Sequence, residues 1–479
     1  MNKKKRLSLG PAVLVTAAFI GPGTVLTASK AGSEFGFILL WAVAFSVVAT
    51  IVLQEMAARM GIITGAGLSQ AIKTSFPHPL ARMSLLGLVL VAILIGNAAY
   101  QTGNILGAAS GVKAVADPSI VPVAIRDKQA ADEEIDNLFV NSIRFQNGLV
   151  VLIAIFALGV IWIGRFDLLQ NLLSMLVALM SMLFIYAAVR SGPVLQEVVM
   201  GFVPRIPSGG EWIVIGIIGT TVVPYNLFLH ASAAAQQWEI DPTDSDSDSK
   251  YRRAIIQSRW DTIMSVVVGG LVTCAILVTA SVAFHHSGPG NNETAIHNQN
   301  IAPHDVALQL EPVLGRSSKL VFSIGLFAAG LTSAITAPIA AGFAVSGCFG
   351  WPGRLKDWRL KVTATAVMLA GVMFAVLFGK SPQQTIILAQ VANGLLLPIV
   401  AILLLVIANR TNLMNQYKNR RLTNVLGVFV VLVATLIAVR QFNSVSQKVY
   451  KMINSANEVS CLECKSGIQR FPNCANDVH

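Results

Sequence analysis

The chain has 479 residues, of which 54% are hydrophobic and only 12% are charged, and its formal net charge is +11. This composition excludes an ordinary soluble domain and predicts a polytopic protein of the lipid bilayer. The positive charge requires no nucleic-acid partner, because basic residues gather in the cytoplasmic loops of membrane proteins.

Apolar runs of about 18 or more residues, the length that crosses about 30 Å of hydrocarbon, recur along almost the whole chain. They predict eleven transmembrane helices. The predicted spans are 9–30, 36–57, 83–112, 147–164, 167–190, 211–236, 259–284, 318–348, 360–379, 384–408 and 424–441.

The first predicted span is interrupted at its middle by Gly21-Pro22-Gly23-Thr24. Proline removes a backbone donor and clashes with the preceding turn, and hydrocarbon offers no water to satisfy the freed groups. Such a break survives in a membrane only where it lines a cavity. The cluster therefore predicts part of a binding site rather than a simple kink.

The sixth predicted span carries a second break, which runs from Thr220 to Asn226 around Pro224. Paired broken helices in corresponding positions of two halves are typical of transporters with inverted repeats. Pro22 and Pro224 are 224 − 22 = 202 positions apart, and each break opens a set of five spans. Because five is an odd number, the second set must enter the membrane from the opposite side.

This pattern predicts an all-α polytopic membrane protein with a LeuT-type (APC superfamily) fold. The fold is a 5+5 inverted repeat with discontinuous helices 1 and 6, followed by an eleventh helix. The predicted units are residues 1–190 and 191–408 for the two repeats, 409–441 for the eleventh helix and 442–479 for a C-terminal tail.

The basic residues predict the orientation of the chain. With the N-terminus in the cytoplasm, more than half of the Lys and Arg side chains fall on the inner side. The loops at 113–146 and 285–317 and the C-terminal tail are then extracytoplasmic. The tail carries Cys461, Cys464 and Cys474, whose spacing predicts a disulfide and a free thiol rather than a metal site.

Several segments together resemble the natural resistance-associated macrophage protein (Nramp) family of metal transporters. The resemblance implies eleven or twelve helices and proton-linked uptake of divalent transition metals. The segments that carry it are Gly10-Pro11, the broken first span, LLWAVAFSVVATIVLQEMAARMGIITG at 39–65, VVPYNLFLHASA at 222–233, GLFAAGLTSAITAPIAAGFAVSGCFGW at 325–351 and AQVANGLLLPI at 389–399.

The residues that bind metal in that family are replaced here. The family's first-span motif is Asp-Pro-Gly-Asn, and the matching positions of its acid and amide are Gly21 and Thr24. In the sixth span, a methionine and an alanine carbonyl match Val223 and Thr220, and the histidine after the proline matches Tyr225. The charged and the soft ligands are therefore both lost.

The third span departs from the family as well. Where the family has two acids that serve proton transfer, this chain has Asn97 and Tyr100. Neither side chain relays a proton at neutral pH, so no proton relay is predicted.

The candidate residues form two groups around the breaks, and the metal ligands implied by the resemblance are Thr24, Thr220 and Asn226. The substrate-binding candidates are Gly21, Pro22, Gly23, Thr24, Thr220, Thr221, Val223, Tyr225 and Asn226. Second-tier residues that line the site or hold a coupling ion are Asn97, Tyr100, His230, Thr332, Ser333, Gln390 and Asn393.

Some of these candidates have a structural interpretation as well. His230 fits a helix-packing donor, and Thr332 and Ser333 fit close helix packing as well as they fit a hard coupling cation. Gln390 and Asn393 flank a glycine and a proline, Gly394 and Pro398, that predict a third break. Elsewhere, Glu55 and Arg59 are four residues apart on the second span and predict an ion pair.

The sequence thus favours a monomeric secondary transporter without a cofactor, and an enzyme is excluded because no catalytic cluster is present. Its substrate is a small inorganic ion or small solute. The resemblance implies a divalent metal, and among metals the carboxylate-free site favours a hydrated hard cation such as Mg²⁺, although charge alone favours an anion. The alternatives are a small anion or zwitterion, which suits two helix N-termini, and a sensor that keeps the fold without transport.

Overall fold

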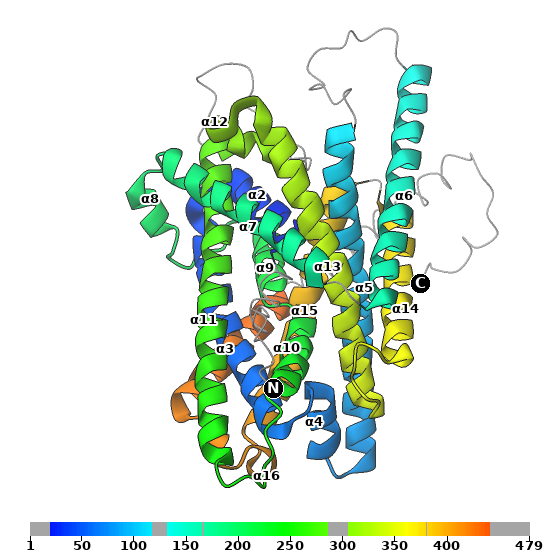
Figure 1. Ribbon diagram of the computed structural model, residues 1–479. Coiled ribbons are helices and arrows are strands. Elements are labelled where there is room, and N and C mark those ends of the chain that lie inside the picture. The colour runs from blue at the N-terminus through cyan, green and yellow to red at the C-terminus, as the bar shows by residue number, and fades with distance from the viewer. Residues whose placement is uncertain (1–19, 117–131, 165–166, 286–304, 380, 441–479) are drawn as a thin grey trace, which may run out of the picture.

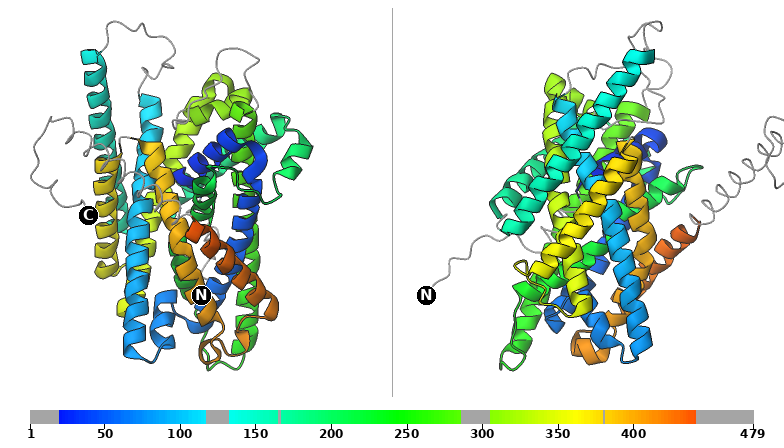
Figure 2. Two further views of the ribbon diagram at one scale, coloured as in Figure 1. Left: turned by 180° about the vertical axis from the view of Figure 1, so that it is seen from behind. Right: turned by 90° about the vertical axis from the view of Figure 1, so that its right-hand side faces the viewer.

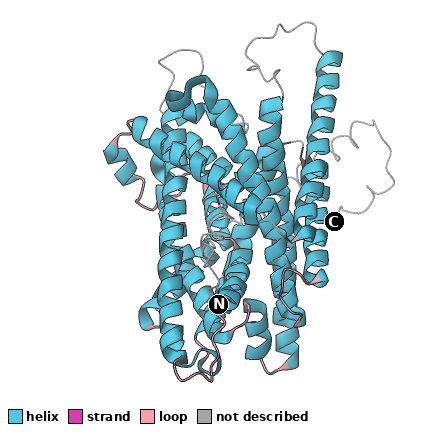
Figure 3. Cartoon of the chain, viewed as in Figure 1, coloured by secondary structure: helices cyan, strands magenta, loops and turns pink. Residues whose placement is uncertain are grey.

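In a computed structural model, residues 20–116, 132–164, 167–285, 305–379 and 381–440 are described. These residues form helices and connecting loops, with no strand among them (Figure 3). The beginning of the first predicted span and the three tail cysteines lie outside the described ranges.

The helices follow the order of the predicted spans, with short helices between them. Their bounds are α2 Pro22–Phe35, α3 Leu40–Thr64, α4 Leu68–Ser75, α5 Pro79–Ala116, α6 Asp132–Ile163, α7 Asp167–Arg190, α8 Leu195–Met200, α9 Glu211–Thr221, α10 Pro224–Gln237, α11 Ser247–Ala280, α12 Glu311–Leu314, α13 Ser318–Phe349, α14 Trp358–Phe378, α15 Pro382–Ala408 and α16 Thr411–Met414, and a last helix spans Arg421–Arg440. In Figure 1, α8 and α12 lie at one end of the bundle, and α4 and α16 lie at the other.

Ten stretches of the described chain are helical, long and apolar enough to cross a membrane. One of them, Pro22–Thr64, contains both α2 and α3, so every predicted span coincides with a helix wherever it is described. The prediction of a multi-pass membrane protein is confirmed.

The degree of burial separates inner from outer helices. In the most apolar part of Glu211–Gln237, which contains α9 and α10, 94% of the residues are buried, against 17% in Arg421–Arg440. Figure 2 shows this last helix, in orange-red, at the outside of the bundle. Exposed apolar side chains on the outer helices suit contact with lipid, whereas the broken sixth span is enclosed by protein.

Glycines let the inner helices approach one another closely. A Cβ on Gly107 of α5 would lie 2.2 Å from Cβ of Pro22, and one on Gly330 of α13 would lie 2.6 Å from the backbone nitrogen of Ala108. Pro22, one of the predicted site residues, therefore packs directly on α5. This contact places the beginning of α2 against the C-terminal half of α5.

The predicted third break is wrong, because α15 continues without interruption through Gly394 and Pro398. A Cβ on Gly394 would lie 2.7 Å from the carbonyl oxygen of Ile215 in α9. The glycine serves this close crossing of α9 and α15 instead of ending a helix.

Candidate functional site

The sixth span is broken as predicted. Helix α9 ends at Thr221, Val222 and Val223 leave the helical conformation, and α10 begins at Pro224. Proline suits the first position of a helix, because its missing N–H would have no partner there. Val223 is buried, and its carbonyl oxygen accepts a hydrogen bond from the N–H of Asn226.

From its proline onward the first break resembles the second, while the residues before Ile20 lie outside the described ranges. Helix α2 begins at Pro22 after Gly21, whose backbone is extended (φ −107°, ψ −176°). The N-termini of α2 and α10 are therefore both buried, and each carries the positive end of a helix dipole. Neither end is capped by a side chain of the described chain.

The two breaks meet through a pair of threonines. The hydroxyl oxygens of Thr24 and Thr220 are 2.8 Å apart, although the residues are 196 positions apart in the chain. Both side chains are buried. The neighbouring Thr221 does not join this contact, because its hydroxyl donates to the carbonyl oxygen of Ile217 in its own helix.

Glycines at the first break bring polar groups close to the backbone. A Cβ on Gly23 would lie 2.1 Å from Nε2 of Gln390, so only glycine allows the amide of Gln390 to approach this closely. A Cβ on Gly21 would lie 3.0 Å from the hydroxyl oxygen of Ser333 and 3.6 Å from that of Tyr100. Three predicted second-tier residues thus surround the break.

The middle of α5 presents a polar face to this region. Tyr100 packs edge-on against Tyr225, with ring centroids 5.2 Å apart and an interplanar angle of 64°. Asn104 lies one turn further, with Oδ1 3.8 Å from the position of a Cβ on Gly21. Sequence reasoning missed Asn104, although its spacing of four from Tyr100 and seven from Asn97 indicates a shared helical face.

Several buried amides around the breaks have no hydrogen-bond partner in the described protein. Both amide atoms of Asn97 and of Asn226 are in this state, as are Oε1 of Gln390 and Nδ2 of Asn393 and Asn104. An unsatisfied buried polar group costs about 1–3 kcal/mol, so native structures usually pair such groups with protein, water or ligand. A polar ligand bound beside the breaks could therefore form hydrogen bonds with these amides.

The other second-tier candidates have partners of their own. The ring nitrogen Nδ1 of the buried His230 donates to the amide oxygen of Gln54 in α3, in agreement with a packing role. The hydroxyl of Thr332 donates to the carbonyl oxygen of Ala328, one turn earlier in α13. Of the pair Thr332 and Ser333, it is Ser333 that lies beside the first break.

Within the described ranges, no group of three or more His, Cys, Asp or Glu side chains could hold a metal ion. The groups beside the breaks are hydroxyls, amides and backbone carbonyls. An ion bound there would be held by uncharged oxygen atoms, which suit hard cations, or by amide, hydroxyl and backbone N–H donors, which suit anions.

A charged cluster lies in the C-terminal half of α3, and we name it the Arg59 cluster after its central residue. Arg59 pairs with Glu55 (Nη2 to Oε2, 3.1 Å), which confirms the predicted ion pair, and Arg259 of α11 also reaches Glu55 at 2.8 Å. Arg59 donates further to the backbone oxygen of Tyr417 and to Oδ1 of Asn419. The cluster joins α3, α11 and the segment before the last helix.

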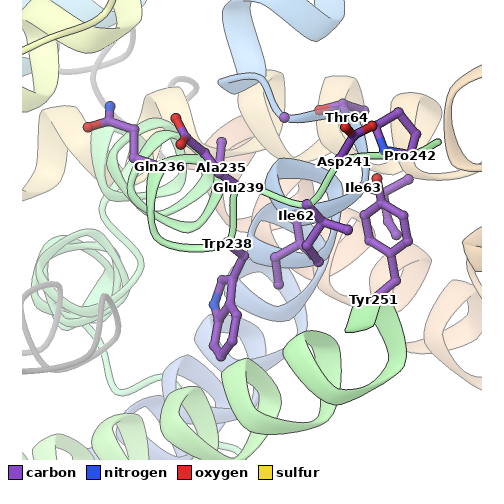
Figure 4. Close-up of a pocket in the computed structure, with 12 residues that line it drawn as sticks. Ile62, Ile63, Thr64, Ala235, Gln236, Trp238, Glu239, Asp241, Pro242 and Tyr251 are labelled. Carbon is purple, nitrogen blue, oxygen red and sulfur yellow. The ribbon is translucent and has the colours of Figure 1, made fainter. Parts of the chain in front are cut away.

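A pocket of about 580 Å³ opens near the same end of the molecule (Figure 4). Its lining includes Thr64, Gln236, Trp238, Glu239 and Tyr251. Because α10 has 14 residues, the pocket is about 20 Å from the second break along this helix.

Comparison with known proteins agrees with this architecture. The family model described as natural resistance-associated macrophage protein-like (Nramp) matches residues 12–443. The divalent metal cation transporter MntH of Klebsiella pneumoniae (strain 342) is 24% identical over 439 residues, which are 91% of this chain and 94% of that protein.

Two solved structures share the fold. A manganese transporter of Eremococcus coleocola has a TM-score of 0.68 at 23% identity, with 91% of this chain and 86% of that chain covered. Mhp1, a nucleobase-cation-symport-1 family transporter, has a TM-score of 0.50 at 12% identity, with 91% and 92% covered. These likenesses confirm the predicted fold class.

Proposed function

Since this chain belongs to the Nramp family, whose members are transporters and not enzymes, we propose that it moves a divalent metal cation across the membrane by alternating access. The observation that carries the proposal is the contact between Thr24 and Thr220, which joins the two breaks. A bound ion at this contact would touch both halves of the inverted repeat. Rocking of one half against the other would then expose it to either side.

The spacing of the two hydroxyls suits a small octahedral cation. Ligand oxygens at 2.0–2.1 Å from Mg²⁺ lie about 2.9 Å from their neighbours, and the two threonine oxygens are 2.8 Å apart. The pair could therefore serve as adjacent ligands without a large movement of the backbone. Asn226, whose buried amide has no hydrogen-bond partner among the described residues, is the third proposed contact.

The absence of charge among these ligands supports a hydrated ion. A bare divalent cation among neutral groups would leave its charge uncompensated. Mg²⁺ dehydrates reluctantly and usually keeps several waters, which spread its charge over more oxygen atoms. We therefore propose Mg²⁺ before Mn²⁺ or Fe²⁺, with no proton relay through Asn97 and Tyr100.

One observation favours a second candidate, a small anion or zwitterion. The N-termini of α2 and α10 are both buried at the breaks, where their dipoles attract negative charge. Gly21 leaves this region without the carboxylate that would repel an anion.

The proposed topology places the N-terminus in the cytoplasm and the pocket of Figure 4 on the cytoplasmic side. Helix α10 runs from the second break toward this pocket, so we propose that the inner pathway follows α10. The protein is proposed to act as a monomer in the cell membrane.

Liposomes that contain the purified protein test the substrate. We expect saturable uptake of Mg²⁺ or Mn²⁺ that Thr24→Ala weakens at least tenfold, while Thr273→Ala, a buried threonine of α11, leaves it unchanged. A matched binding assay uses the same cations, small anions and amino acids.

The outcomes separate the candidates. No binding of divalent cations at millimolar concentration would refute the metal proposal. Uptake of an anion that Gly21→Asp abolishes would support the second candidate, and binding without flux would identify a sensor. Acidification of the lumen during uptake would contradict the absence of proton coupling.

A further inference from the structure

Two buried tyrosines contact each other near the two breaks. Tyr225 is the second residue of α10, and Tyr100 lies near the middle of α5. Their rings meet edge to face, and their exposed fractions are only 2% and 1%. An aromatic pair in this geometry holds both rings in fixed orientations, because the edge of one ring packs on the face of the other.

The hydroxyl of Tyr100 points to the first break. It is 3.6 Å from the position that a Cβ on Gly21 would occupy, and the hydroxyl of Ser333 and Oδ1 of Asn104 are 3.0 Å and 3.8 Å from the same position. Three oxygen atoms from α5 and α13 therefore converge on the space beside residue 21. We call them the oxygen triad.

Glycine at position 21 is explained by this triad and not by the backbone. The extended backbone there suits any residue, since φ is −107°. A side chain would instead press on Ser333, since a contact of 3.0 Å is tighter than an ordinary van der Waals contact. Gly21 and Ser333 are thus sterically matched, and a carboxylate at 21 would extend into the space that the triad surrounds.

We propose that Tyr100 determines cation specificity: its hydroxyl, with the rest of the triad, holds water molecules of a hydrated divalent cation bound at Thr24 and Thr220. This inference rests on the proposed function and identifies the outer contacts of the same ion. Phenol, alcohol and amide oxygens bond well to the water shell of a hard cation and offer no soft ligand to a dehydrated transition metal. Tyr225 is a positioning residue that orients the Tyr100 ring.

The first test compares uptake of Mg²⁺ and Mn²⁺ by the wild type, Tyr100→Phe and Tyr225→Phe in liposomes. Tyr100→Phe removes one oxygen and keeps the ring, so we expect KM for Mg²⁺ to rise at least tenfold and the preference for Mg²⁺ over Mn²⁺ to fall. We expect Tyr225→Phe to change KM less than threefold. Tyr186→Phe is the control, because this tyrosine of α7 is 53% exposed at the outside of the bundle.

A double variant tests whether a carboxylate at position 21 competes for space with the Tyr100 hydroxyl of the triad. We expect Gly21→Asp alone to lose Mg²⁺ uptake, and Gly21→Asp with Tyr100→Phe to recover Mn²⁺ uptake, because removal of the hydroxyl gives the carboxylate room. A merely structural role for Tyr100 would make the double variant worse than either single variant.

The results distinguish this inference from the function on which it rests. If the wild type shows no divalent flux, the proposed function fails. If the wild type transports but Tyr100→Phe and Ser333→Ala both keep its KM and its Mg²⁺ preference, the specificity role of the triad is overturned. Ser333→Ala removes a second triad oxygen, so a folding defect in one variant still leaves the other as a test.

Discussion

The centre around the two breaks and the Arg59 cluster both bury polar side chains, but they satisfy them differently. At the breaks the side chains are neutral, and both amide atoms of Asn97 and of Asn226 have no partner in the described protein. In the cluster, Arg59 bonds to Glu55, to the backbone of Tyr417 and to Asn419. One region leaves bonding capacity for a ligand, and the other uses its capacity within the protein.

We propose that this difference separates a binding site from a structural joint. Groups that are already paired hold their elements in one arrangement, whereas unpaired neutral groups gain most when something binds. Variants in the cluster should therefore change stability first, and variants at the breaks should change transport first.

The largest effect is expected from Arg59→Met. It removes a 7% exposed charge and all of its hydrogen bonds, and breaking a buried ion pair typically lowers the free energy of unfolding by about 3–5 kcal/mol. Thermal unfolding in detergent measures the loss. The control is Arg252→Met, which breaks a pair with the same helical spacing but with 64% exposure, where little or no change in the unfolding temperature is expected. Equal losses in the two variants would contradict the comparison.

A smaller effect on stability and a large one on transport are expected at the threonine pair. Thr220→Ala removes the hydrogen bond between the two hydroxyls, at a cost of about 0.5–1.5 kcal/mol. The double change of Thr24 and Thr220 to Val removes both groups together and should be closer to neutral for folding, while cation uptake is lost. Unfolding temperatures and liposome flux, measured on the same preparations, check this. Retained uptake by the double variant would show that the ion does not bind at this pair.

The smallest effect on stability is expected from a change of pH that acts on Asp248, in the first turn of α11. The hydroxyl of Tyr417 and then Arg252 stabilise the Asp248 carboxylate and lower its pKa below the usual 3.8. A lowered carboxyl pKa stabilises the fold above the unfolded value, so the contribution is lost as pH falls below about 4. The unfolding temperature between pH 3 and 7 measures this. In Asp248→Asn, the unfolding temperature should depend less on pH at the acidic end of this range. The threonine pair contains no group that titrates there, so its hydrogen bond should not depend on pH.

The local features of the chain could be predicted, and the contacts between distant segments could not. Hydropathy located the spans, and the prolines located the second break and the beginning of α2, because these signals lie within one helix. The Thr24–Thr220 contact and the bonds from Arg59 to residues 417 and 419 depend on how the helices cross. Gly394 shows the limit: a glycine near a proline predicts a break, but here the glycine only makes room for α9.

The neutral pair of threonines has a consequence for the energetics of the membrane potential. A site of side chains that are neutral at physiological pH adds no charge of its own, so an empty carrier could reorient without moving charge through the field there. The loaded carrier would move two charges, and a potential of 100 mV contributes about 2.3 kcal/mol for each, or about 4.6 kcal/mol in total. The membrane potential alone could then drive uptake by such a protein, because the bound ion and not the protein carries the charge across the field.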